Sequence, residues 1–195
     1  MNVIDIFLEF HQTLSKDRYI ERLFDKLGEE QLRTRPYPTV NSIAWLLWHM
    51  ARVEDAGINR LVVAQPQVLD EGDWNTRMNV PIHHHGTGMT DPEVTELSQR
   101  INMAALRAYL DAVRTKTATV VKTLTLEHLD ERNNLTYLHQ VLFEEGMLNP
   151  AKDWGDSPPY QASKGELLIH FGVTHNYGHI YEAFTICSLL GVSPW

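Results

Sequence analysis

Apolar residues recur near the start of the chain at spacings of three, four and six, which is the pattern of an amphipathic helix. The repeat runs from Val3 to Leu27 and includes Ile6, Phe7, Phe10, Leu14, Ile20, Leu23 and Phe24. Gly28 follows directly and is suited to end a helix, because glycine adopts the left-handed conformation at little cost. The pattern therefore predicts a first helix over residues 3–27.

A second helix is predicted after the turn-prone stretch RTRPYPT. Asn41 or Ser42 can cap it, its apolar face begins at Ile43, and it ends before Pro66. Residues 65–90 are rich in glycine, proline and histidine and keep no sustained period. We expect a long irregular connection there.

The triplet DPE is a strong start signal for a third helix, with Asp91 as N-cap and Pro92 in the first turn, where a missing N–H is tolerated. This helix is predicted to continue to about Leu124, and residues 127–148 to form shorter helical pieces. The stretch NPAKDWGDSPPYQ is predicted to be a loop.

Ser163 and Glu166 form a capping-box pattern that opens a last helix, which runs through Leu190 to Gly191 and Pro194. Four long amphipathic helices without an alternating strand pattern predict an all-α four-helix bundle, in which sites are built from side chains that face the core. We interpret residues 1–195 as a single domain, with its longest loop between the second and third long helices.

Charge and cysteine content narrow the class of function. Seventeen Lys and Arg against 25 Asp and Glu give a net charge of -8, so there is no basic surface for nucleic acid. The lone cysteine, Cys187, and the absence of a signal-peptide pattern favour a cytoplasmic protein. Charged residues interrupt every apolar run, so no membrane span is expected.

Histidine is the one residue type in excess, with ten in the chain. On the last predicted helix, His175 and His179 are four residues apart, so their imidazoles share one face within reach of one ion. That face also carries Glu182 among apolar residues, and such groups are costly to bury unless paired or bound to metal. A third ligand would be His49, in the middle of the second helix. For each histidine, a hydrogen-bonded role in the core is the alternative.

The remaining histidines are not expected to bind this ion. At 100° per residue His170 lies on another surface than His175. No partner at ligand spacing is found for three others: His11, His128 and His139. The run His83-His84-His85 is interpreted as a solvated loop, with adventitious metal binding or a position over the mouth of the bundle as alternatives.

Two segments, NSIAWLLWHMARVED and ELLIHFGVTHNYGHIYEA, resemble the DinB-like superfamily of metal-dependent four-helix bundles, which includes bacillithiol and mycothiol S-transferases. The resemblance covers essentially the whole chain. In that family three histidines bind a divalent metal inside the bundle. By position, the resemblance implies that the ligands here are His49, His175 and His179.

Three neutral imidazoles would leave a dipositive ion able to activate a water or a thiol. The first hypothesis is therefore a metal-dependent S-transferase or hydrolase, the second a non-catalytic bundle that binds a metal or small ligand, and the third an Fe(II) enzyme. Zinc or nickel is the expected ion. The expected partners are a small-molecule substrate, such as a low-molecular-weight thiol, and a second copy of the chain in a homodimer.

Three side chains near these ligands have candidate roles. Glu182 is the predicted catalytic residue, as general base or by orienting the nucleophile, with holding a ligand imidazole, capping or a surface ion pair as alternatives. Arg52 either neutralises an anionic substrate or pairs with Glu54 or Asp55. Trp45 either lines the pocket or belongs to the core, and we favour the core.

Overall fold

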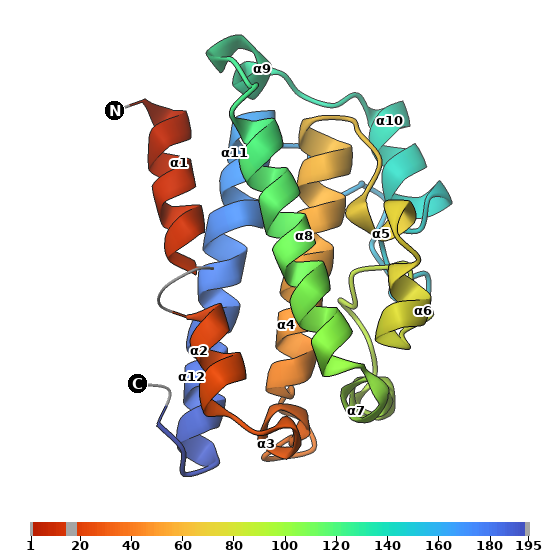
Figure 1. Ribbon diagram of the computed structural model, residues 1–195. Helices are drawn as coiled ribbons and strands as arrows, with labels where there is room; N and C mark the ends of the chain where they lie inside the picture. The colour runs from red at the N-terminus through yellow and green to blue at the C-terminus, as the bar shows by residue number, and fades with distance from the viewer. Residues whose placement is uncertain (1, 15–18, 194–195) are drawn as a thin grey trace.

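The computed structural model describes residues 2–14 and 19–193, and within them the chain is helical (Figure 1). The first half contains α1 (Val3–Gln12), α2 (Ile20–Lys26), α3 (Glu29–Arg33), α4 (Ile43–Glu54), the π-helix η2 (Asp55–Val62), α5 (Val68–Glu71), α6 (Trp74–Met78) and α7 (Asp91–Arg100). The second half contains α8 (Met103–Val121), α9 (Leu126–Asp130), α10 (Leu135–His139), η3 (Gln140–Glu144), α11 (Lys164–Ile169), η4 (His170–Thr174) and α12 (His175–Leu189). The described residues contain no β-strand, which confirms the all-α class.

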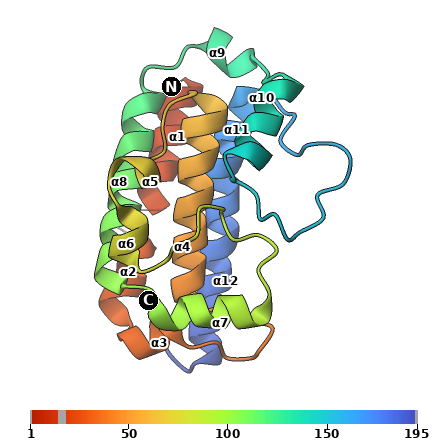
Figure 2. The ribbon, with the colours of Figure 1, turned by 90° about the vertical axis from the view of Figure 1, so that its right-hand side faces the viewer.

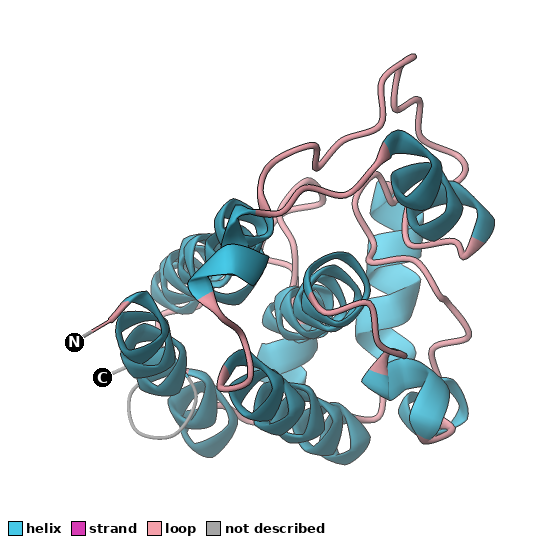
Figure 3. Ribbon diagram, turned by 90° about the horizontal axis from the view of Figure 1, so that it is seen from above, coloured by secondary structure: helices cyan, strands magenta, loops and turns pink. Residues whose placement is uncertain are grey.

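The long segments α4–η2, α8 and α11–η4–α12 run side by side, and α1 packs against α8 and η4 (Figures 1 and 3). Buried apolar side chains form two clusters along this bundle. One joins the first part of α4 to α8 and to the second half of α12, and the other joins η2 to α1, α10 and α11. None of the helices within the described residues has the length and apolar character needed to span a bilayer.

The predicted helix over residues 3–27 is divided into α1 and α2, and residues 15–18 between them lie outside the described residues. Gly28 directly follows the C-cap of α2, as predicted, but its conformation is not left-handed. Leu27 is the C-cap of α2, and Gly28, with φ of -70°, is the N-cap of α3. The Gly28 N–H bonds to Gln31 Oε1 at 2.9 Å, so this glycine begins a helix.

The second predicted helix is confirmed as α4 and its continuation η2. Ser42 is the cap, because its Oγ accepts a hydrogen bond from the Trp45 N–H at 3.0 Å. Where η2 meets the last long helix the backbones lie close together, and a Cβ on Gly57 would stand 2.4 Å from the Phe171 ring. Only glycine allows this approach.

The third predicted helix is interrupted. Its N-cap is Thr90, which forms a capping box with Glu93, and Asp91 is already the first helical residue. α7 ends before Ile101, where Arg33 donates to the carbonyls of three residues, Ser98, Gln99 and Ile101. Asn102 then caps α8, because its Oδ1 accepts from the Ala105 N–H at 3.0 Å.

The short pieces predicted over 127–148 are confirmed as α9, α10 and η3, and the 65–90 connection includes the short helices α5 and α6. The last predicted helix is confirmed with its capping box between Ser163 and Glu166. Its interior contains the π-helical turn η4, which alters which residues share a face. Pro194 lies outside the described residues.

Candidate metal centre

Two neighbouring helices bring His49, His175 and His179 together. His49 lies in the middle of α4, whereas His175 begins α12 and His179 follows one turn later. The candidate ligand atoms of the three rings lie within 4.8 Å of one another. His49 Nε2 and His175 Nε2 are 3.2 Å apart, and the ring of His179 is centred 5.0 Å from that of His49. The two apolar clusters meet here, which places the imidazoles inside the bundle.

Each of these imidazoles has an oxygen acceptor at its Nδ1 atom. His49 Nδ1 bonds to the His85 carbonyl, His179 Nδ1 to Glu182 Oε2 at 2.8 Å, and His175 Nδ1 faces the Asn176 side-chain oxygen at 3.5 Å. These partners assign the proton to Nδ1 and leave a lone pair on Nε2. Histidine ligands of metals are held in this way by a second hydrogen bond.

The spacing of the nitrogen atoms fits a small divalent cation. A tetrahedral zinc ion with bonds of about 2.0 Å would hold two imidazole nitrogens about 3.3 Å apart. The observed separation of 3.2 Å between His49 Nε2 and His175 Nε2 matches this value. With both protons on Nδ1 these atoms cannot bond to each other, so two lone pairs face the same point. The donor set therefore suits a metal ion.

Burial keeps His49 and His175 in the neutral form that metal ligation requires. His49 is only 3% exposed, and burial lowers its pKa well below the usual 6.5, with neighbouring His85 and His179 adding to the effect. Burial also lowers the pKa of His175 to about 2, again reinforced by the adjacent rings. His175 and His179 are half-buried, so the α12 side is the more open one.

Comparison with known proteins bears on this arrangement. The family model of the DinB superfamily matches residues 16–183. The chain belongs to the DinB superfamily. A solved structure, the conserved protein of a locus from Enterococcus faecalis, is similar with a TM-score of 0.70 and 18% identity, over 98% of this chain and 99% of that one. At that identity the likeness concerns the fold alone. The comparison with curated proteins finds no match.

In this DinB-superfamily chain Glu182 contacts one of the three histidines. Its Oε2 accepts from His179 Nδ1 at 2.8 Å, and its Oε1 accepts from the Asn41 side chain at 3.1 Å. Burial alone would raise the pKa of Glu182, but these two hydrogen bonds outweigh burial and lower it. Glu182 is therefore ionised at neutral pH and fixes the orientation of His179.

A second polar chain runs from His175 into the core. Asn176 donates from Nδ2 to Glu54 Oε2 at 2.7 Å, while His11 bonds to Glu54 Oε1 at 2.7 Å and Arg114 to Oε2 at 3.2 Å. All four side chains are buried. Sequence reasoning found no partner at ligand spacing for His11, and its partner, Glu54, lies 43 residues away. In the sequence, the asparagine directly after a candidate ligand is the one local indication of these linked polar side chains.

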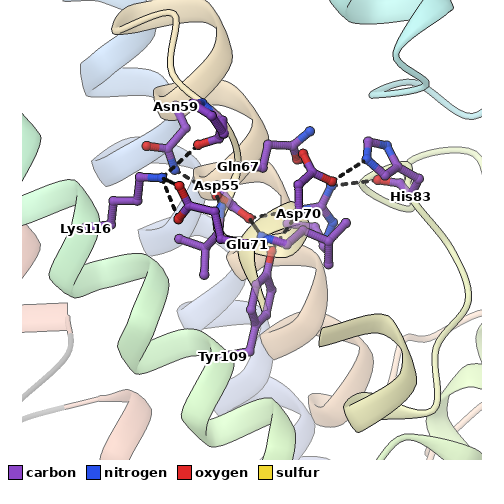
Figure 4. Close-up of polar contacts among 12 residues, drawn as sticks. Asp55, Asn59, Gln67, Asp70, Glu71, His83, Tyr109 and Lys116 are labelled. Atoms are coloured by element: carbon purple, nitrogen blue, oxygen red, sulfur yellow. Dashed lines mark hydrogen bonds and ion pairs between the residues drawn. The ribbon is translucent and has the colours of Figure 1, made fainter. Parts of the chain in front are cut away.

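Of the two roles considered for Arg52, the neutralisation of an anionic substrate is wrong, because the side chain is fully buried. Its side chain is 0% exposed and pairs with Asp55, which confirms the alternative, and it also donates to Tyr109, Gln67 and the His83 carbonyl. Asp55 in turn accepts from Tyr109 at 2.6 Å (Figure 4). This cluster fixes the connection between η2 and α7 against α4.

The prediction of a solvated loop is wrong for one member of the histidine run. His83 and His84 are half-buried, but His85 is 1% exposed. The α6–α7 connection crosses α4 and carries His85 to the candidate centre (Figure 2). Burial, and then the Arg52 cation, lower the pKa of His85 to about 3, so its ring is neutral.

Trp45 and His170 complete the aromatic surroundings. Trp45 is buried, which confirms its place in the core, and its ring stacks on His49 at 4.6 Å. His170 is exposed and lies outside the candidate ligand set, which agrees with its exclusion as a ligand, but its ring lies closer to His175 than the predicted separate surface implies, with the ring centres 5.8 Å apart. The π-helical turn η4 places residues five apart above one another. Two histidines are exposed and distant from these helices in the sequence: His128 and His139.

Proposed function

We propose that this chain binds one divalent metal ion through His49, His175 and His179, and that it is a metal-dependent enzyme of the S-transferase or hydrolase type. One observation carries the proposal: three imidazoles converge, and each has an oxygen acceptor facing its Nδ1, so that the Nε2 lone pairs remain for an ion. Membership of the DinB superfamily supports the same assignment.

When bound by three imidazoles, a divalent ion offers an open coordination position and lowers the pKa of a water or thiol there toward neutrality. The side chains around the three histidines determine from which side a substrate can approach. Trp45 stacks on His49 and closes that side to solvent, while the half-buried His175 and His179 leave the α12 side open to a substrate. The imidazole set suits zinc, nickel and iron, and we propose zinc or nickel.

Glu182 has two proposed roles that differ in their consequences. As general base it would accept a proton from the attacking thiol or water, and this catalytic role stays a prediction. Its two hydrogen bonds, from His179 and Asn41, favour a positioning role that acts through His179. A carboxylate with both oxygens engaged is less available as a base.

The same two hydrogen bonds of Glu182 favour a second candidate function, a bundle that binds a metal or small ligand without turnover.

If the chain is an enzyme, we propose a low-molecular-weight thiol together with an electrophile as its substrates. The homodimer also stays a prediction.

Elemental analysis of the protein purified without chelator tests the centre. We expect about one divalent ion per chain in the wild type and almost none in His175→Ala. The matched control is His170→Ala, because that ring lies 5.8 Å from His175 but outside the candidate ligand set. Equal metal content in the wild type and His175→Ala would overturn the proposal. Loss of metal in His170→Ala as well would show that the ligand set is wrong.

A further inference from the structure

His85 is a buried side chain beside the candidate metal centre that belongs to neither the ligand set nor the acceptors of the ligand side chains. Its ring is centred 5.9 Å from that of His49 and 6.2 Å from that of Trp154, so it lies between α4 and the 149–160 loop. Its backbone is fixed at both polar atoms. The His85 N–H bonds to the Met147 carbonyl at 3.1 Å, and its own carbonyl accepts from His49 Nδ1.

The hydrogen bonds of the His85 ring define which nitrogen carries the proton. The Thr87 backbone N–H donates to His85 Nδ1 at 3.3 Å, so Nδ1 holds a lone pair and the neutral ring has its proton on Nε2. His85 Nε2 is buried and finds no partner among the described residues. Burying a donor without an acceptor is costly, and native structures rarely do so. An acceptor from outside the chain would satisfy it.

We propose that His85 Nε2–H donates a hydrogen bond to a small anion bound at the three-histidine centre, so that the centre selects thiolates or carboxylates over neutral ligands. This inference rests on the proposed function, since the anion is held there by the metal. Three neutral imidazoles leave the charge of a divalent ion uncompensated, which favours an anion in the open position. The anion must also accept a hydrogen bond in order to satisfy the buried His85 Nε2, because the ring of His85 is centred only 5.9 Å from that of His49.

His85 is a donor to the bound ligand and not a fourth metal ligand. Coordination through Nε2 would require the ring proton to move to Nδ1, where Thr87 N–H already donates. The two N–H groups would then face each other. The Thr87 contact therefore keeps Nε2 as a donor, and the backbone carbonyl of the same residue orients His49.

Cobalt-substituted protein gives a direct test that does not depend on turnover. Co²⁺ is bound first and followed by its visible absorption, and then acetate, 2-mercaptoethanol or imidazole is titrated as the exogenous ligand. The variants are His85→Phe, which removes the donor and keeps the carbonyl that orients His49, and His85→Gln, which restores an N–H donor. His84→Phe, at a half-buried position in the same loop, is the matched control.

We expect His85→Phe to bind Co²⁺ as the wild type does and to bind acetate, the thiol, or both roughly 10- to 100-fold more weakly, as expected for one hydrogen bond to a charged acceptor. A loss for only one of them identifies which anion class the site takes. His85→Gln should recover part of the loss, and imidazole affinity should not change, because imidazole bound through one nitrogen offers no second acceptor. His84→Phe should match the wild type.

Unchanged affinity for both anions in His85→Phe would overturn the inference while leaving the metal centre intact. Loss of Co²⁺ itself in His85→Phe would also overturn it, since His85 would then support the metal directly. Failure of the wild type to bind Co²⁺ would overturn the proposed function and this inference together.

A measurement on the unmodified protein remains decisive if His85→Phe does not fold. The ¹⁵N spectrum of the zinc-loaded wild type should show His85 protonated on Nε2, with this resonance shifting when acetate or the thiol is added. A His85 ring that carries its proton on Nδ1, or that does not respond to either anion, would refute the inference.

Discussion

Glu54 is a buried carboxylate, 1% exposed, and its replacement tests whether the polar side chains behind the candidate metal centre stabilise the fold. It accepts hydrogen bonds from His11, Arg114 and Asn176. Glu54→Gln keeps the shape of the side chain and removes its charge. Arg114, which is also buried, would then be a cation without a counter-charge in the core. We expect a large loss in the free energy of unfolding.

The expected loss is about 3–5 kcal/mol, the usual cost of removing one partner of a buried ion pair. The pKa of Glu54 gives an independent value for this loss in the free energy of unfolding. Burial alone would raise this pKa, but His11 and Arg114 together lower it from 4.5 to about 2. This lowering corresponds to about 3 kcal/mol of stability. Because the folded-state pKa is depressed, the contribution is complete above pH 4.5 and is lost as the pH falls toward 2.

Urea unfolding of the metal-free protein at pH 7 measures this loss. The matched control is Glu96→Gln, because Glu96 pairs with Arg100 at 2.9 Å but its side chain is 69% exposed. We expect the control to change stability by less than about 0.5 kcal/mol. The difference between wild type and Glu54→Gln should narrow at pH 3. A Glu54→Gln variant within 1 kcal/mol of the wild type at pH 7, roughly the scale of an ordinary surface change, would refute the reasoning.

Four further predictions concern the metal and the helix contacts. A metal at roughly 100–1,000 times its Kd should raise the free energy of unfolding by about 3–4 kcal/mol, so its removal by a chelator should lower the Tm measured by calorimetry. An unchanged Tm would argue that the histidines bind no metal. Metal occupancy measured by elemental analysis should fall as the pH drops below about 6.5, because imidazoles must be neutral to bind a metal. The free energy of unfolding of the metal-free protein should fall over the same range, because the imidazoles of the unfolded chain take up protons there while the pKa of His175 in the fold is about 2. Gly57→Ala should destabilise by about 1–3 kcal/mol in urea unfolding because its Cβ meets Phe171, whereas Gly178→Ala, with no atom within 4 Å, should stabilise by up to about 1 kcal/mol. Glu182→Gln should keep the metal and lower the turnover of a thiol with an electrophile by roughly 10²–10⁴ if Glu182 is the general base, and unchanged turnover would exclude that role.

Local signals account for what could be predicted from the sequence. Helix periodicity and caps at Ser42 and Ser163 located the two long helices that carry the candidate ligands. The four-residue spacing of His175 and His179 depends only on α-helical geometry, and α12 is regular from His175 onward. The position of His49 among apolar residues was enough to predict its burial.

Interruptions of helices were not predictable, because they depend on distant partners. The break between α7 and α8 is stabilised by Arg33, whose guanidinium bonds to carbonyls about 65 residues further along the chain, including Ser98. The π-helical turn η4 invalidated the calculation for His170, since a fixed angle of 100° per residue fails once a turn closes on the fifth residue. Neither the break between α7 and α8 nor the π-helical turn is marked by the local residue composition.

The acceptor that orients His49 shows why the rest of the centre could not be read from the sequence. Glu182 and Asn176 lie within three residues of the histidines they contact, so local reasoning could reach them. The acceptor for His49 is a backbone carbonyl 36 residues away, at His85, and a carbonyl group is common to all residue types. Its place is fixed by Arg52, which donates to the His83 carbonyl at 2.6 Å. Arg52 therefore acts on the candidate centre through the loop, because it holds the segment whose carbonyl at His85 bonds to His49 Nδ1.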